Sequence, residues 1–184
     1  MTGAPSYVDT LNTLAVGEAR GRDLYEAWAA ATPDAVLART LRAVAIREGE
    51  HAAAFRKRLC ELGYSVGENQ DAGFTQRLTK LRSNATDLDK FESVFGFGRE
   101  HAHDGYDERL QRIFDDRTID PLTGSLFGRF IAEERDSRRQ LEAAYERIKG
   151  GDEPVGDEAL AQMTQRLERL TRTIEELKAL RRQR

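Results

Sequence analysis

Three ionisable residues, Glu18, Glu48 and His51, fall on the apolar faces of two predicted helices near the N-terminus. Glu18 follows Leu11 by seven residues, or two helical turns, so it shares the inward-facing stripe of that helix. On the next predicted helix, Glu48 follows Val44 by four residues and His51 lies three residues beyond Glu48. Residues three apart lie on one helical face, so Glu48 and His51 form a Glu-x-x-His pair on a buried stripe.

Buried carboxylates at these positions indicate a compensating cation. Removing a carboxylate from water is unfavourable unless a cation or a hydrogen-bond donor compensates it. A metal ion is an efficient partner, and carboxylates with one imidazole per ion suit iron or manganese. Alternatively, Glu18, Glu48 and His51 hydrogen-bond to one another or to an arginine without metal. Because the three residues lie at matched depth on adjacent helices, we favour metal binding.

The elements that must position these residues are helices. Apolar residues recur at three- and four-residue spacing and no convincing strand pattern occurs, which predicts an all-α fold. We expect long helices over residues 7–30, 34–62, 87–114 and 121–148, with a short helix over 74–82. A long crossover over residues 64–75 lies between the second and third long helices, and this order predicts a four-helix bundle.

The C-terminal segment has a coiled-coil pattern. After a linker that contains Pro154, apolar residues alternate at three- and four-residue intervals: Leu160, Met163, Leu167, Leu170, Ile174 and Leu177. We therefore expect a bundle domain over residues 1–150 and a coiled-coil-like helix over 157–184. That helix either joins two chains into a homodimer or packs on the bundle, and the pattern leaves both arrangements open.

Composition excludes several classes of protein. The 184 residues carry 29 Lys and Arg against 32 Asp and Glu, a net charge of −3, which argues against a nucleic-acid binder. No window is apolar enough for a membrane span, and the N-terminus has no signal-peptide pattern. The single cysteine, Cys60, excludes a disulfide framework and any four-cysteine iron or zinc site. We expect a cytoplasmic protein.

Two segments resemble the first two helices of rubrerythrins, in the ferritin-like superfamily: Leu14-Ala15-Val16-Gly17-Glu18-Ala19 and Arg47-Glu48-Gly49-Glu50-His51-Ala52. The resemblance covers residues 7–148 and implies a ferritin-like bundle with iron, as a two-iron centre, or with manganese. It implies Glu18, Glu48 and His51 as ligands of one metal, with Glu48 as the bridge, and reduction of peroxide or dioxygen. A rubredoxin-like segment would need four cysteines, so electrons would come from a separate donor.

The third long helix departs from the pattern of that family. Arg99-Glu100-His101-Ala102-His103-Asp104 resembles the family's third-helix segment, which implies Glu100 as a ligand. The stripe itself carries Arg99 and His103, so His103 would replace the bridging glutamate. Glu100 faces inward only if a bulge at the glycines of this helix, such as Gly96 or Gly98, turns it.

The fourth long helix admits two registers. The motif pairs Glu133 with Asp136, whereas the apolar stripe pairs Glu134 with Ser137. We prefer Glu134, because burial is a physical constraint. In a two-metal centre, His103 and Glu134 would help to hold the second metal. Neither register supplies a second histidine.

The missing histidine and the position of Arg99 on a stripe support a second hypothesis. In this hypothesis, the bundle has lost its metal and Arg99 neutralises Glu48 or Glu134. The chain would then act as a scaffold or interaction protein that assembles through residues 157–184.

Overall fold

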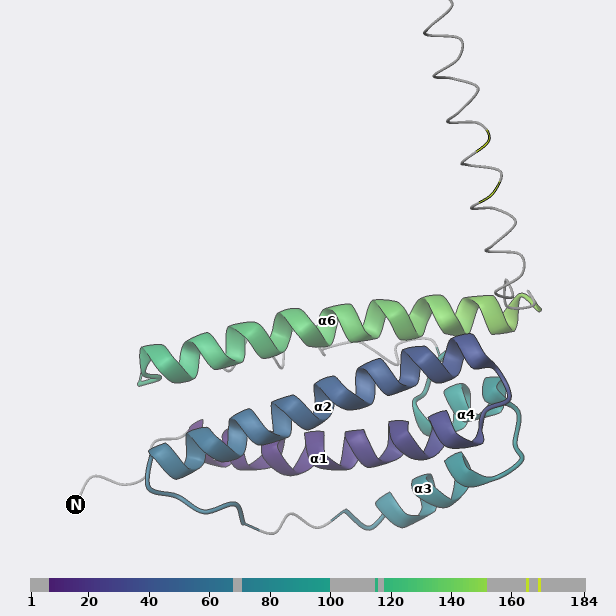
Figure 1. Ribbon diagram of the computed structural model, residues 1–184. Helices are drawn as coiled ribbons and strands as arrows, with labels where there is room; N and C mark the ends of the chain where they lie inside the picture. The colour runs from purple at the N-terminus through teal and green to yellow at the C-terminus, as the bar shows by residue number, and fades with distance from the viewer. Residues whose placement is uncertain are drawn as a thin grey trace, which may run out of the picture. The chain divides into compact units, whose positions relative to one another are not determined.

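The computed structural model describes residues 7–67, 71–99, 115, 118–151, 165 and 169, and the fold is stated for these residues (Figure 1). They form helices only, which confirms the all-α prediction for this part of the chain. The helices are α1 (Tyr7–Ala31), α2 (Ala35–Glu61), α3 (Phe74–Arg82), α4 (Asp87–Val94) and α6 (Pro121–Lys149). The bounds of α1, α2, α3 and α6 lie within one residue of the predicted ones.

The chain divides into two compact units, residues 1–150 and 151–184. In the second unit the structure describes Gly151, Gln165 and Arg169, and the last two are helical and exposed. The six apolar residues of the predicted heptad pattern therefore all lie outside the described residues. No helix in the described ranges is long and apolar enough to cross a membrane.

Aspartates define where α2 and α6 begin. Asp34 accepts hydrogen bonds from the backbone N–H groups of Val36 and Leu37, both at 2.9 Å. Asp120 caps α6 in the same way, and Pro121 follows it at a position where a missing N–H costs nothing.

Three ion pairs set the register of α6 against α2. Asp120 at the start of α6 binds Arg58 near the end of α2 at 2.9 Å. Asp136 in the middle of α6 binds Arg47 at 3.0 Å. Near the end of α6, Arg147 binds Asp34 at the start of α2. These pairs fix an antiparallel arrangement, which Figure 1 shows as two helices that run alongside each other.

The apolar core of the first unit consists of two clusters. One lies towards the C-terminal end of α1 and includes Trp28, Leu41 and Phe91. The other lies towards the N-terminal end of α1 and includes Leu11 and Phe55. Between them, α1, α2 and α6 each contribute polar side chains to the interior, and the candidate site is this polar layer.

The predicted helix over residues 87–114 is interrupted after its second turn. α4 ends at Val94, and the N–H groups of Phe95 and Phe97 both donate to the Phe91 carbonyl at 3.2 Å. Gly96 and Gly98 then take positive φ values of 77° and 74°, which other residues rarely adopt. The glycines therefore end the helix instead of forming a bulge within it. Residues 100–114 lie outside the described part of the chain.

Candidate metal centre

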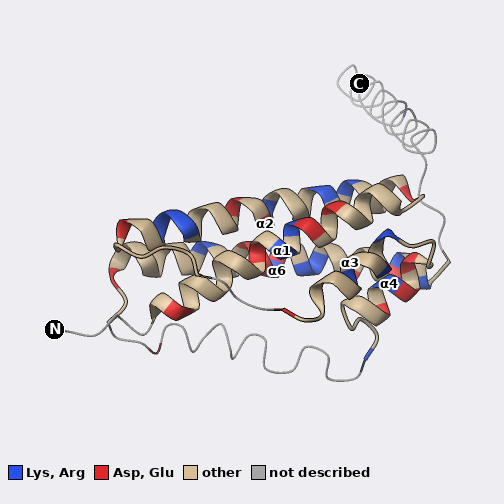
Figure 2. Cartoon of the chain, turned by 90° about the horizontal axis from the view of Figure 1, so that it is seen from below, with Lys and Arg blue, Asp and Glu red and all other residues tan. Residues whose placement is uncertain are grey.

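The polar layer between the two apolar clusters contains carboxylates and one imidazole from three helices. α1 provides Glu18, α2 provides Glu48 and His51, and α6 provides Glu133 and Glu134. Glu18 and Glu48 are each 8% exposed and His51 is 3% exposed. Figure 2 shows Lys and Arg interspersed with Asp and Glu along the helices, so these interior acids are part of a chain with mixed charge.

His51 is enclosed by carboxylates on both ring nitrogens. Its Nδ1 lies 3.1 Å from Glu18 Oε2 and 3.5 Å from Glu134 Oε1. Its Nε2 lies 2.8 Å from Glu133 Oε2. The ring also packs edge-on against Phe130, with centroids 5.1 Å apart. These contacts hold the imidazole plane in one orientation between α1 and α6.

The surroundings change the pKa of each group in the layer. Burial lowers the pKa of His51, but hydrogen bonds to Glu134, Glu18 and Glu133 outweigh this effect and raise it to about 10. Burial raises the pKa of Glu18, and the charge of Glu134 raises it further. The pKa of Glu48 is well above its usual value because of burial and the charges of Glu18 and Glu134. Without another cation, the layer holds extra protons.

The geometry of three of these residues suits a metal ion. One ligand atom each from Glu18, His51 and Glu134 lie within 4.8 Å of one another. Donors around an ion with bonds of about 2.1 Å lie roughly 3.0–3.4 Å apart, so small side-chain rotations are sufficient. Together, these donors are two carboxylates and one imidazole.

Glu48 lies beside this group and against the backbone of α1. The nearby carboxyl group of Glu18 contributes to the raised pKa of Glu48. A Cβ at Gly21 would collide with the Glu48 carboxylate, so this approach needs the glycine. The sequence analysis missed Gly21, and its only signal was its position three residues after Glu18.

The predicted site residues are in two groups. Glu18, Glu48, His51 and Glu134 lie together in the polar layer. Glu100 and His103 lie outside the described residues. Arg99 is exposed at the turn after α4, so the expectation that it faces inward to replace a metal is wrong.

On α6, Glu133 and Glu134, which were alternatives in the sequence, both lie close to the imidazole of His51. The stripe register holds, because Ser137 is 3% exposed and Glu134 faces Nδ1 of His51. Glu133 nevertheless binds the opposite ring nitrogen, whereas Asp136 turns to Arg47. The family motif indicated Glu133, but the sequence analysis treated Glu133 and Glu134 as alternatives and preferred Glu134.

A pocket of about 160 Å³ adjoins the layer. Glu48, Glu134 and Ser137 lie on its polar side, and Tyr25 and Phe97 are among its aromatic residues. The pocket provides room for a small molecule next to the carboxylates.

Comparison with known proteins gave no match among protein families, curated proteins or solved structures. A functional assignment therefore depends on the residues of the polar layer.

Proposed function

We propose that this chain is a ferritin-like metal protein that binds iron or manganese through Glu18, His51 and Glu134. The observation that supports it most directly is the convergence of their ligand atoms, within 4.8 Å of one another, from three helices in the interior. The order of the donors along the chain, Glu, then Glu-x-x-His, then Glu, agrees with the rubrerythrin-like motif. A divalent cation would also compensate the excess of carboxylates over imidazole in the layer.

The contacts of His51 assign a role to each ring nitrogen. Glu133 already holds Nε2, so Nδ1, which faces Glu18 and Glu134, would be the metal donor. A carboxylate on the other nitrogen fixes the tautomer and raises the basicity of a ligating histidine. Glu48, beside Glu18, would add a carboxylate oxygen. One nitrogen with several oxygen donors favours iron or manganese over metals that prefer nitrogen and sulfur.

The reaction we propose is the reduction of hydrogen peroxide or dioxygen. For peroxide, two electrons and two protons give two water molecules, and a separate electron-donor protein supplies the electrons. A bound iron or manganese ion would provide the redox chemistry. The pocket beside Glu48 and Glu134 is large enough for such small substrates. The carboxyl groups there would hold and deliver protons.

Metal titration tests this proposal. The full chain is stripped with a chelator and titrated with Fe(II) or Mn(II) without oxygen, and the retained metal is measured by elemental analysis. We expect at least one tightly bound ion per chain, and a loss of affinity of about 10-fold or more in His51→Gln and Glu134→Gln. Glu26→Gln and Glu146→Gln make the same charge change as Glu134→Gln at exposed positions of α1 and α6, and should bind as the unsubstituted chain does. Retention of less than about half an ion per chain would contradict the proposal.

One observation favours a second function, that of a metal-free scaffold. Both nitrogens of His51 already lie at hydrogen-bonding distance from carboxylates, 3.1 Å and 2.8 Å, so a protonated imidazole satisfies part of the layer by itself. In this proposal the chain forms a homodimer through residues 157–184. Removal of these residues should then halve the mass measured by light scattering, and an unchanged mass would exclude that segment as the assembly element.

A further inference from the structure

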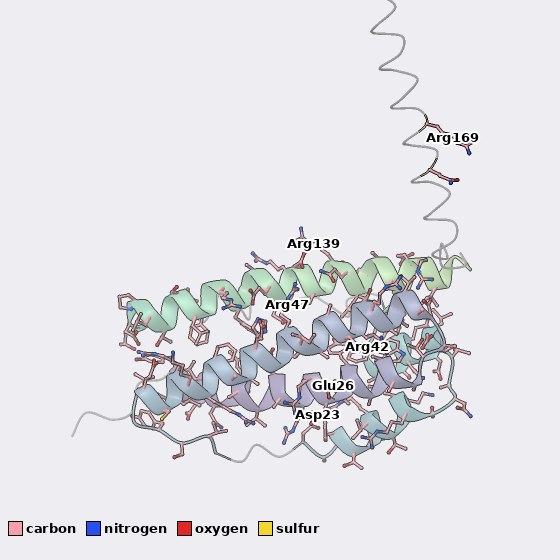
Figure 3. The ribbon with its side chains drawn as sticks, viewed as in Figure 1. Asp23, Glu26, Arg42, Arg47, Arg139 and Arg169 are labelled. Carbon is pink, nitrogen blue, oxygen red and sulfur yellow. The ribbon has the colours of Figure 1, made fainter. Side chains whose placement is uncertain are left out.

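Arg47 joins α2 to the turn of α6 that carries the candidate ligands. Its Nη1 donates to the Glu133 carbonyl at 2.9 Å and to Ser137 Oγ at 2.8 Å. Its Nη2 donates to Asp136 Oδ2 at 3.0 Å. The side chain is only 26% exposed, and Figure 3 shows it between the two helices. One guanidinium therefore occupies three acceptors on a single turn of α6.

These contacts bear on the pocket next to the metal cluster. Among the described residues, the side chains with oxygen atoms that line this pocket, and could therefore bind a second ion, are Tyr25, Glu48, Glu134 and Ser137. The hydroxyl already accepts from Arg47, and the Asp136 carboxylate is turned to the same guanidinium. In the part of the chain that the structure describes, His51 is the sole imidazole, and it belongs to the first ion.

The local charge also opposes a second ion. Arg47 donates a hydrogen bond to Ser137, which lines the pocket. Arg138 also lines the pocket, and it forms an ion pair with Glu142 at 2.8 Å. An arginine keeps its proton at all physiological pH values, so neither side chain can lose its positive charge when a metal ion approaches. Because Arg47 is largely shielded from solvent, salt screens its charge less than that of a surface residue.

We propose that Arg47 makes this a single-ion centre. The guanidinium places a fixed positive charge next to the pocket, and it occupies the Ser137 and Asp136 oxygens that a second ion could use on α6. This inference rests on the proposed metal binding, and it specifies that one ion binds per chain.

The test is the number of ions per chain in the full-length protein. Chelator-stripped protein is titrated with Co(II) or Mn(II), and the bound ions are counted by native mass spectrometry and by elemental analysis after gel filtration. We expect one ion in the unsubstituted chain. Replacement of Arg47 by Gln together with Ser137→His removes the cation and adds an imidazole beside Glu134 at the pocket, and this double variant should bind a second ion.

Matched variants separate the charge of Arg47 from its role in holding α6. Ser137→His alone keeps the guanidinium and should bind its second ion at least about 10-fold more weakly than the double variant does. Arg58→Gln removes the arginine of another α2–α6 ion pair, outside the polar layer, and should still bind one ion. Circular dichroism and thermal unfolding establish that each variant is folded.

Two ions of similar affinity in the unsubstituted chain would overturn the inference, whatever the variants do. A second ion in Arg58→Gln, or an equally tight one in Ser137→His alone, would overturn it as well. A folded double variant that binds one ion would also count against it. If the unsubstituted chain binds no ion, the proposed metal function fails first, so the two failures can be distinguished.

Discussion

Two glycines on α1, one turn apart, differ in what a side chain would meet. A Cβ at Gly21 would collide with the Glu48 carboxylate, whereas a Cβ at Gly17 meets nothing within 4 Å. Replacing a helical glycine by alanine stabilises a helix by about 0.5–1 kcal/mol when the space is free. We expect that gain in Gly17→Ala and a smaller gain or a loss in Gly21→Ala, measured by urea unfolding.

The same pair of variants reports on the site. Displacement of the Glu48 carboxylate in Gly21→Ala should weaken metal binding, and Gly17→Ala should bind as the unsubstituted chain does. Equal stabilities and equal metal affinities in the two variants would show that the position of Glu48 against α1 has no role.

The pKa shifts in the polar layer predict how stability depends on pH in chelator-treated protein. The folded-state pKa of His51 is about 10, above its usual 6.5, so its contribution is complete below about pH 6.5 and is lost as pH rises towards 10. The raised pKa values of Glu18 and Glu48 act in the same direction, because the folded state favours their protonated forms. Thermal unfolding between pH 6 and pH 10 should show a falling midpoint.

His51→Gln is the control for this profile, because it removes the imidazole whose pKa is raised to about 10. Its midpoint should fall less over the same range. An unsubstituted chain with a flat profile would contradict the assignment of a proton to the imidazole in the absence of metal.

At the site, sequence spacing was sufficient for some residues and insufficient for others. Glu18, Glu48 and His51 could be predicted because each lies on a helical stripe with apolar neighbours, and helical periodicity alone places such residues inside. That both Glu133 and Glu134 reach the imidazole depends on how closely α6 approaches α2. That distance is set by ion pairs between residues far apart in the sequence, so spacing along one helix does not contain it.

Among the elements, the end of α4 is where periodicity gave a wrong result. Phe91, Val94 and Phe95 continue the apolar spacing up to the last residues of the helix, so the pattern predicted an uninterrupted helix. Gly96 and Gly98 end it, because both take positive φ values. A hydrophobic pattern reports which face is buried, and it carries no information on where the backbone leaves the helix.

This turn provides a prediction at the scale of the element. Gly98 combines a φ of 74° with a backbone position where a Cβ would collide with the hydroxyl of Tyr145. Gly98→Ala should therefore destabilise the protein by about 1–2 kcal/mol or more, measured by chemical unfolding. Gly128→Ala on α6, where a Cβ meets nothing within 4 Å, is the matched control and should be neutral or stabilising. Similar losses in both variants would argue against the strained turn.

On the scale of the whole molecule, the all-α class could be predicted because the apolar residues of the described helices follow helical spacing. The division of the core into two apolar clusters was not predicted from the sequence. It depends on which faces of α1, α2 and α6 pack against one another. The polar layer interrupts the apolar core because donor side chains from three helices meet in the interior.

Metal binding should therefore stabilise the whole first unit. A ligand that binds only the folded state at 100 times its Kd adds about 2.7 kcal/mol to the free energy of unfolding. We expect Mn(II) or Fe(II) to raise the thermal midpoint of the unsubstituted chain by several degrees, and His51→Gln to lose this increase. Mg(II), which prefers oxygen donors, serves as the comparison ion. An equal increase in His51→Gln would indicate binding elsewhere.

The separation of the core by the polar layer also has a consequence for cooperativity. Trp28 and Phe55 belong to clusters at opposite ends of the same helices, so each end can open while the other stays packed. Amide hydrogen exchange should then give two opening free energies for α1 and α2 in chelator-treated protein. An ion held by Glu18, His51 and Glu134 would couple the ends, and the two free energies should converge when metal is added.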